Sequence, residues 1–363
     1  LAAAADPGPT VSKLDTGLPV WDLAATDFSG DGHADILALC ADPEASPPVK
    51  QCEVFLADGV GGYPPKASFV LPLANKTGAV FLAEVDGRAP KELAVSGPEG
   101  VSLYSFREGA LKLDRSVSFD SLFPGGVKEP TFINDTAVDL DGDGRDEWLV
   151  PVPSGYEIRT PDALLGRPEA DVVSSMRMDG GGRISHRLPG FLAFTAPGQS
   201  AKGVAFLSEQ FADFAYGERW ERHARYKIPN NLQEKWQAHA EMEDLDANGL
   251  PDLILTQTQG TVNLKVQTQV FMASEAFTLP SAPSSSFQAN GAFTDPILKD
   301  VNGDGKLDLI FIKVPVGVKF FVNYFVMQKL AVQVEVYLYH ENGYGKTADF
   351  QTSLSIHAPE NRE

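Results

Sequence analysis

Short runs of apolar and β-branched residues recur along this chain and are separated by polar segments that contain glycine and aspartate. Runs of this length and composition are typical of β-strands and are too short for helices. The order at the start of the chain is shown by five of them: Val20–Ala25, Ile36–Leu39, Glu53–Leu56, Ser68–Leu71 and then Ala79–Leu82, with which the order begins again. The pattern therefore predicts units of four strands.

Related polar segments begin at residues 27, 84, 139, 195, 244 and 300, so the unit repeats every 49 to 57 residues. The last unit ends with runs of the same kind, Val334–Tyr339 and Phe350–Leu354. A period near fifty residues with several strands per unit is typical of a β-propeller, in which each small sheet buries its faces against its neighbours. We expect an all-β protein with six or seven four-stranded blades, as one domain over residues 11–357 with a tail at 358–363.

Four of the polar segments share a nine-residue template with oxygen-bearing side chains at positions 1, 3, 5 and 9. Hard cations such as Ca²⁺ prefer six to eight oxygen ligands, and a backbone carbonyl at position 7 would add one more. The predicted ligands, with the position-7 residue fourth in each set, are Asp27, Ser29, Asp31, His33 and Asp35; Asp139, Asp141, Asp143, Arg145 and Glu147; Asp244, Asp246, Asn248, Leu250 and Asp252; and Asp300, Asn302, Asp304, Lys306 and Asp308. We expect about four structural Ca²⁺ ions, one in each loop.

The residues after these loops distinguish them from other calcium sites. An EF-hand would extend to a twelfth-position Glu between two helices, whereas here the ninth residue is followed at once by an apolar run such as Ile36–Leu39 or Leu309–Ile312. The loops also lie far apart, unlike the tandem nonapeptides of parallel β-helices. Each loop is therefore predicted to connect two strands.

The remaining two segments are degenerate copies of the template. Glu84–Glu92 keeps acids at positions 1, 3 and 9 but has Arg88 at position 5, and Thr195–Gly203 has lost its ligands while keeping apolar runs on both sides. Whether either one binds an ion is left open by the sequence.

With its four complete loops and its period, the chain resembles the FG-GAP/VCBS repeat family, the calcium-looped β-propellers related to the head of integrin α-subunits. The resemblance covers nearly the whole chain. It implies a propeller with one Ca²⁺ in each intact loop, used for adhesion or assembly rather than for catalysis.

Two segments depart from the repeat. The largely apolar Phe320–Leu330 is predicted to form one short helix packed on the propeller, since a membrane span needs about 20 apolar residues. Ser208–Ile228 is an aromatic and charged insertion, for which packing within a blade is favoured over a partner surface.

Charge and composition limit the partners. The 49 acidic residues exceed the 30 Lys and Arg residues and give a formal net charge of −19. Nucleic acids and anionic membranes attract basic surfaces, so we expect neither as a partner, and we expect no transmembrane segment.

Two cysteines, Cys40 and Cys52, lie at facing ends of adjacent predicted strands. We expect a disulfide between them, which would require an oxidising compartment; the alternative is two reduced core thiols. Residues 1–10 resemble the end of a signal peptide or a flexible N-terminus. We therefore expect a secreted protein, either extracellular or periplasmic.

No catalytic motif is recognisable, and four acidic loops at equivalent positions suit metal binding better than one active site. Our main hypothesis is a non-catalytic scaffold that binds a protein or a glycan, within a larger envelope or extracellular assembly. The alternative is a propeller-based polysaccharide lyase or glycoside hydrolase in which His239 or an acid near the central channel is the base. A calcium-dependent lectin is a weaker third hypothesis.

Overall fold

The computed structural model describes residues 12–88, 90–133, 136–177, 183–195, 201–208, 210–228, 236–260, 265–275, 278–290, 292–293, 295–314, 329–341 and 343–357. Within these ranges the chain forms strands, turns and loops, and it contains no helix. The prediction of an all-β protein is confirmed. The described part of the chain accordingly has no helix that is long and apolar enough to cross a membrane.

The chain divides into two compact units, Leu1–Pro168 with Ser175–His186, and Glu169–Ser174 with Arg187–Glu363. Each is described by itself. The predicted single domain over residues 11–357 stays a prediction.

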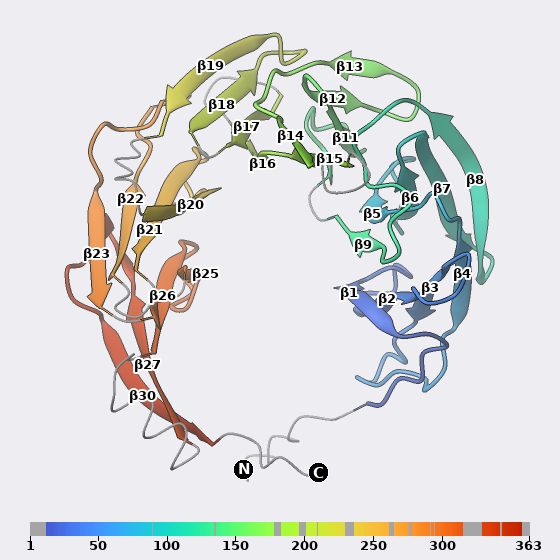
Figure 1. Ribbon diagram of the computed structural model, residues 1–363, viewed down its shortest axis with the longest axis horizontal. Helices are drawn as coiled ribbons and strands as arrows, with labels where there is room; N and C mark the ends of the chain where they lie inside the picture. Colours follow the sequence, from blue (N-terminus) through green and yellow to red (C-terminus); the bar gives the residue numbers. More distant parts are fainter. Residues whose placement is uncertain are drawn as a thin grey trace, which may run out of the picture. The chain divides into compact units, whose positions relative to one another are not determined.

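The first unit contains mainly antiparallel sheets in which most neighbouring strands are consecutive in the chain (Figure 1). The first sheet has the order β1-β2-β3-β4, formed by β1 (Val20–Thr26), β2 (Asp35–Asp42), β3 (Val49–Phe55) and β4 (Phe69–Leu73). The second has the order β8-β7-β6-β5-β9, formed by β5 (Ala79–Ala83), β6 (Glu92–Gly97), β7 (Gly100–Arg107), β8 (Ala110–Ser118) and β9 (Thr131–Phe132), which is parallel to β5. The third has the order β10-β11-β12-β13, formed by β10 (Ala137–Val138), β11 (Glu147–Val152), β12 (Gly155–Arg159) and β13 (Leu164–Gly166).

The second unit is built in the same way. Its first sheet contains β16 (Gly190–Phe194), β17 (Gly203–Leu207), β18 (Phe211–Tyr216) and β19 (Arg222–Lys227), in that order. The next contains β20 (Trp236–Glu243), β21 (Asp252–Gln259), β22 (Lys265–Phe271) and β23 (Ser285–Asn290). In the last, β24 (Ala292–Phe293) and β25 (Ile297–Lys299) both pair with β26 (Asp308–Val314), followed by β27 (Lys329–Tyr337) and β30 (Phe350–His357). A short pair, β28 (Tyr339–His340) with β29 (Gly343–Tyr344), also belongs to the second unit. A further short pair, β14 (Val173–Arg177) with β15 (Arg183–Arg187), falls mostly within the Ser175–His186 segment of the first unit.

Consecutive sheets within a unit pack face to face, so the middle strands bury both faces. Leu37 and Leu39 of β2 pack against Val80 and Leu93 of the second sheet. Ala38, the residue between them, points to the other face, where it packs with other buried residues. Such strands are apolar at successive positions because neither face meets water.

The same packing joins the other sheets. One core lies between the second and third sheets of the first unit and contains Phe81 and Trp148. In the second unit, Phe214 packs with Leu255 of the following sheet. The last core centres on Phe287 and Phe311. Within a unit, each sheet therefore shares part of its hydrophobic core with a neighbouring sheet.

The structure tests the two irregular segments to different extents. Ser208–Ile228 forms β18 and β19 with the turn between them, and Phe214 and Ile228 are buried, so the preference for packing within a sheet is confirmed. Most of the predicted helix at 320–330 lies outside the described residues. Its last two residues, Lys329 and Leu330, begin strand β27 instead.

The expected Cys40–Cys52 disulfide is wrong for this structure, in which both cysteines are buried free thiols. Cys40 lies opposite Gln51, while Cys52 lies opposite Leu39, one position away. Neighbouring positions on a strand point to opposite faces of the sheet, so Cys52 packs with Leu39 on one face and Cys40 with Phe55 on the other. Burial raises the pKa of each thiol to about 12. These cysteines therefore give no support to an oxidising compartment.

Candidate metal centres

The four complete loops lie where the sequence predicts them, between β1 and β2, β10 and β11, β20 and β21, and β25 and β26. In every one, the position-1 Asp accepts a hydrogen bond from the N–H of the position-6 glycine. The N–O distances are 2.9 Å for Gly32 to Asp27, 3.1 Å for Gly144 to Asp139, 2.9 Å for Gly249 to Asp244 and 3.0 Å for Gly305 to Asp300. The loop backbone is thus wound around one carboxylate in the same way four times.

This winding requires left-handed backbone at positions 4 and 6, where glycine has no steric penalty. Position 6 has φ between 83° and 89° in the four loops. Position 4 is glycine in three loops, but in the third it is Ala247, with φ of 59°.

Positions 3, 5 and 7 are linked by a second repeated contact. The backbone N–H of each position-7 residue donates to the side-chain oxygen at position 5. The four pairs are His33 to Asp31 (2.8 Å), Arg145 to Asp143 (2.8 Å), Leu250 to Asn248 (2.7 Å) and Lys306 to Asp304 (2.9 Å). The N–H of position 5 in turn donates to position 3 in three loops, at Asp141, Asp246 and Asn302. A carboxylate has about four lone-pair sites, so these bonds leave oxygen sites for a cation.

Two position-7 side chains lie against neighbouring structure. The Lys306 ammonium lies 4.4 Å from the centre of the Tyr339 ring. The His33 imidazole lies beside the turn at Gly59. At these positions the backbone carbonyl remains the predicted ligand.

The position-9 acids have a role that the sequence analysis missed. Asp35, Glu147, Asp252 and Asp308 are at most 1% exposed, and one oxygen of each accepts a loop N–H, from Ser29, Leu140, Leu245 and Val301 respectively. In three loops the second oxygen accepts an N–H just beyond the next strand: Ala57 (2.7 Å), Ala273 (2.6 Å) and Tyr339 (2.9 Å). This bridging carboxylate fastens the loop to the end of the following strand. Position 9 is the first residue of a strand, and in an antiparallel hairpin that residue lies near the end of the next strand. The hairpin register could therefore have indicated this bridging contact from the sequence.

Two loops bring three acids together. Oxygens of Asp139, Asp141 and Glu147 all lie within 4.8 Å of one another, as do those of Asp244, Asp246 and Asp252. Burial, together with the neighbouring carboxylates, raises the pKa of Glu147 and of Asp252 to about 7. A bound divalent cation would stabilise the charged forms, so both donor sets fit a hard cation such as Ca²⁺.

In the other two loops position 3 is not an acid, so the ligand sets are Asp27, Asp31 and Asp35 with Ser29, and Asp300, Asp304 and Asp308 with Asn302. The Ser29 hydroxyl oxygen is buried and has no hydrogen-bond partner within the described part of the protein. Buried polar atoms are rarely left unpaired, so this oxygen also fits a cation ligand. The Asn302 amide nitrogen donates to Asp304 at 3.0 Å, which fixes that side chain within its loop.

The degenerate loop at 84–92 keeps two of the hydrogen bonds of the template and has a protein cation beside it. The Arg88 N–H donates to Glu84 at 2.9 Å and the Val85 N–H to Glu92 at 3.0 Å, as the template requires. The Arg107 guanidinium lies 3.3 Å from the Asp86 carboxylate. This loop therefore has a side-chain charge near the acids. In the loop at 195–203, residues 196–200 lie outside the described residues.

Successive loops also contact each other. The Asp146 N–H donates to the Glu84 carbonyl at 2.6 Å, and the Leu307 N–H donates to the Leu245 carbonyl at 2.9 Å. The Tyr339 hydroxyl reaches Asp246 at 3.4 Å. Within each unit, one loop thus supports the position of the next.

His239, the histidine singled out from the sequence, lies on β20 with its Nδ1 3.1 Å from Asp295. Both side chains are about half exposed or more, at 63% and 46%. Glu241, on the same side of β20, has a pKa raised by burial and lowered in part by His239. In sequence the group lies just before two of the metal loops, with Glu241 three residues before Asp244 and Asp295 five residues before Asp300.

No family model matches this sequence, and no curated protein matches it. Among solved structures, the chain is similar to an exotype rhamnogalacturonan lyase, YesX, with 16% identity and a TM-score of 0.45, over 91% of this chain and 54% of the lyase chain. It thus spans about half of the lyase. A member of the DUF4221 family from Bacteroides vulgatus is similar with 10% identity and a TM-score of 0.37, over 82% of this chain and 90% of that chain. BBS1N, in complex with ARL6DN, is similar with 16% identity and a TM-score of 0.31, over 84% and 91%. Similarities at this level carry no argument about the function of this chain.

Proposed function

We propose that this chain is a non-catalytic, calcium-stabilised β-propeller that acts as a binding scaffold for a protein or a glycan. Its blades would be the four- and five-stranded sheets, and its place would be outside the cytoplasm, as a secreted, extracellular or periplasmic protein. One observation carries the proposal: the same hydrogen-bonded acidic loop connects two strands at four places in the repeat.

The proposed role of the ion follows from the position of the loop. Three or four acidic or amide side chains gather between a strand that enters and a strand that leaves, and their mutual repulsion opposes that arrangement. A divalent cation would remove the repulsion and hold the two strands together. Binding of Ca²⁺ to the folded state alone would then stabilise the protein by mass action.

The propeller proposal is supported by the packing of the sheets. Within each unit, consecutive sheets share their hydrophobic cores, which is how propeller blades bury both faces. A blade built in this way is rigid and presents loops for recognition.

Calcium titration by calorimetry, on protein stripped with a chelator, tests the metal part of the proposal. We expect about four binding sites, one per complete loop. The double variant Asp244→Ala/Asp246→Ala should lose one of them. The control Asp86→Ala changes an acid in the loop that has Arg107 beside it, and it should leave the number unchanged. Wild-type protein that binds no Ca²⁺ would contradict the proposal.

The second candidate is a propeller-based polysaccharide lyase or glycoside hydrolase. The group formed by His239, Asp295 and Glu241 favours it, because a paired histidine beside a carboxyl of raised pKa is a possible acid–base set. The test is release of reducing or unsaturated sugar ends from a panel of polysaccharides. Turnover by the wild type that disappears in His239→Ala would replace the scaffold with this enzyme.

A further inference from the structure

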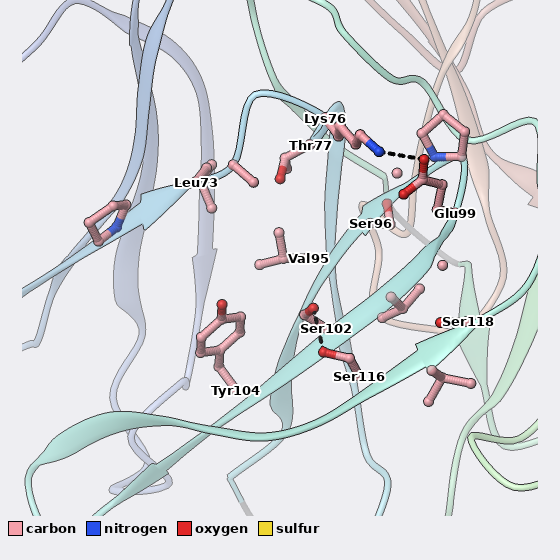
Figure 2. A pocket seen from close by; sticks show the side chains of 17 residues that line it. Leu73, Lys76, Thr77, Val95, Ser96, Glu99, Ser102, Tyr104, Ser116 and Ser118 are labelled. Atoms are coloured by element: carbon pink, nitrogen blue, oxygen red, sulfur yellow. Dashed lines mark hydrogen bonds and ion pairs between the residues drawn. The ribbon is translucent and has the colours of Figure 1, made fainter.

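A cleft lies between the first and second sheets of the first unit, away from the metal loops (Figure 2). Its volume is about 250 Å³, and its walls come from β4, from the segment 74–77 and from β6, β7 and β8. The size is below the ~300 Å³ at which pockets for drug-sized molecules begin, so it suits one small ring.

The cleft exists because side-chain size changes along the face of the second sheet. Leu93 lies beside Tyr104 in the strand register, and both pack in the core against the first sheet. One step along, Val95 lies beside Ser102, which faces Ser116. In the following row the residues are Gly97, Gly100 and Ser118. Large side chains fill the space between the sheets at one end, and small ones leave it open at the other.

The backbone conformation requires a glycine in the row formed by Gly97, Gly100 and Ser118. Gly100 has φ of 134°, and a Cβ there would lie 2.0 Å from the Val117 carbonyl oxygen. A larger residue at this position would disrupt the pairing of β7 with β8. The opening is therefore part of the way these strands pair.

The polar groups on the cleft wall are mainly hydroxyls. The Ser102 and Ser116 Oγ atoms lie 2.9 Å apart. Two hydroxyls have two protons, and only one is used between them, so the pair can donate one hydrogen bond to a ligand and accept others. Figure 2 shows the Tyr104 ring at one end of the space, with its hydroxyl directed into it.

The charged groups of the cleft balance. Lys76 and Glu99 form an ion pair of 2.5 Å at the rim and are both exposed. They are the only charged side chains among the lining residues, so phosphate or carboxylate ligands would find no unpaired cation, which such groups require. The floor at β6 and β7 presents side chains of paired strands. Strand addition by a peptide would need the open edges of β4 and β8, which are the end strands of their sheets, so the test includes a peptide.

We propose that this cleft binds one residue of a neutral saccharide. The hydroxyls of Ser102 and Ser116 form hydrogen bonds with sugar hydroxyls, and the Tyr104 ring packs against the C–H face of the sugar. Aromatic rings supply contact area with a polar end, which suits a ligand with both apolar and hydroxyl surfaces. The inference rests on the proposed scaffold function in taking a glycan as the partner, but no residue of the cleft is a proposed metal ligand.

An array of neutral gluco-, galacto-, manno- and xylo-oligosaccharides tests the ligand class, with oligogalacturonates and an extended decapeptide as the other probes. The full chain is used, with binding confirmed by saturation-transfer NMR and calorimetry. We expect at least one neutral oligosaccharide to bind. Binding of none, or displacement of a bound sugar by the peptide or the acidic probe, would overturn the proposal.

Variants then locate the site. Ser102→Ala/Ser116→Ala removes both hydroxyls without changing the packing, and it should weaken binding about tenfold. The matched control Ser353→Ala/Ser355→Ala changes two exposed serines on β30 and should bind like the wild type. Tyr104→Phe should bind more tightly than Tyr104→Ala, because it keeps the ring. Wild-type affinity in the double serine variant would overturn the proposal.

A chelator separates this test from that of the scaffold. Below the unfolding temperature of the calcium-free protein, sugar binding should persist, since no cleft residue is a proposed metal ligand. Calcium titration that fails while sugar binding succeeds would leave the cleft and remove the metal proposal. The opposite result would remove only the cleft.

Discussion

Ala247 is the residue at which the loop template has its clearest backbone cost. A φ of 59° is unfavourable by roughly 1–2 kcal/mol for a residue with a Cβ, and the other three loops have glycine at this position. The side chain at position 3, Asp246, lies beside it and accepts the Asn248 N–H at 3.2 Å. The loop keeps its conformation because the surrounding hydrogen bonds outweigh this cost.

Ala247→Gly should therefore raise the free energy of unfolding by up to about 1 kcal/mol, the steric gain being reduced by the greater entropy of glycine in the unfolded chain. Urea denaturation measures it. The control is Gly249→Ala, where φ is 83° and a Cβ would lie 3.0 Å from the Thr195 carbonyl oxygen; this change should destabilise. A stabilised Gly249→Ala would contradict the account of the winding.

Lys50 is a second residue whose role depends on its position in the fold. Its side chain is buried, and its ammonium donates to the carbonyls of Asn75, Thr77 and Val127. Burial lowers the pKa of this lysine. One charged group thus satisfies three carbonyls from two loops of the first unit.

Lys50→Met keeps the length of the side chain but leaves these carbonyls without a donor. We expect a loss of roughly 3 kcal/mol in the free energy of unfolding, because each unpaired buried polar group costs about 1–3 kcal/mol. Lys112→Met is the control, since Lys112 is half-exposed and its ion pair with Glu108 lies at the surface, where such pairs contribute little. Equal effects in the two variants would refute this role.

At the scale of the elements, the bridging carboxylates show how loop and strand are joined. Asp35, Asp252 and Asp308 each accept backbone N–H groups from the loop and from the end of a following strand. Glu92 holds this position in the loop next to Arg107, where its oxygens contact the Val85 N–H and the Ser105 hydroxyl. Burial raises the pKa of Glu92.

This shift predicts a pH dependence. The folded state holds the proton of Glu92 more tightly than the unfolded state does. This contribution to stability is therefore complete below the ordinary Glu pKa of 4.5 and is lost as the pH rises through the folded-state pKa. Glu92→Gln removes this contribution. Its stability relative to the wild type should therefore be higher at pH 7 than at pH 4.5, as measured by urea denaturation. Glu108→Gln, at an exposed site, is the control, and a pH-independent difference for Glu92→Gln would contradict the prediction.

For the whole molecule, the distribution of loops between the units matters. Each unit contains two complete loops, those beginning at 27 and 139 in the first and those at 244 and 300 in the second. If Ca²⁺ holds strands together as proposed, its removal affects both units.

Hydrogen exchange with and without a chelator tests this strand by strand. Removal of Ca²⁺ should increase amide exchange in β10–β11 and β20–β21, which flank the two acid triads. Without the ion, local opening of these strands no longer requires the free energy of releasing it. The strands β5–β6 flank the loop with Arg107 and serve as the internal control. Equal changes in all three pairs would show that the chelator acts generally and not through the loops.

The repeat, the strands and the loop positions were predictable because they depend on local properties. Apolar runs such as Ile36–Leu39 fall within strands, and the acids at positions 1, 3, 5 and 9 lie in strand-connecting loops, since ligand spacing and strand alternation are both set by nearby residues. The pairing of Cys40 with Cys52 failed for the same reason that it was attractive. Their strands are adjacent, but a shift of one position in the register places the two thiols on opposite faces.

The sequence by itself determined an all-β chain, its period near fifty residues, and four acidic loops with the chemistry of a hard-cation site. Only the tertiary structure decided which oxygens converge, how the position-9 acids bridge to a third strand, that Lys50 reaches three carbonyls, and that Ser102, Ser116 and Tyr104 line one cleft. The physical reason is that periodicity and ligand spacing are carried by residues close in the chain. Convergence depends on strand register and on how one sheet packs against the next, which residues far apart in the chain decide together.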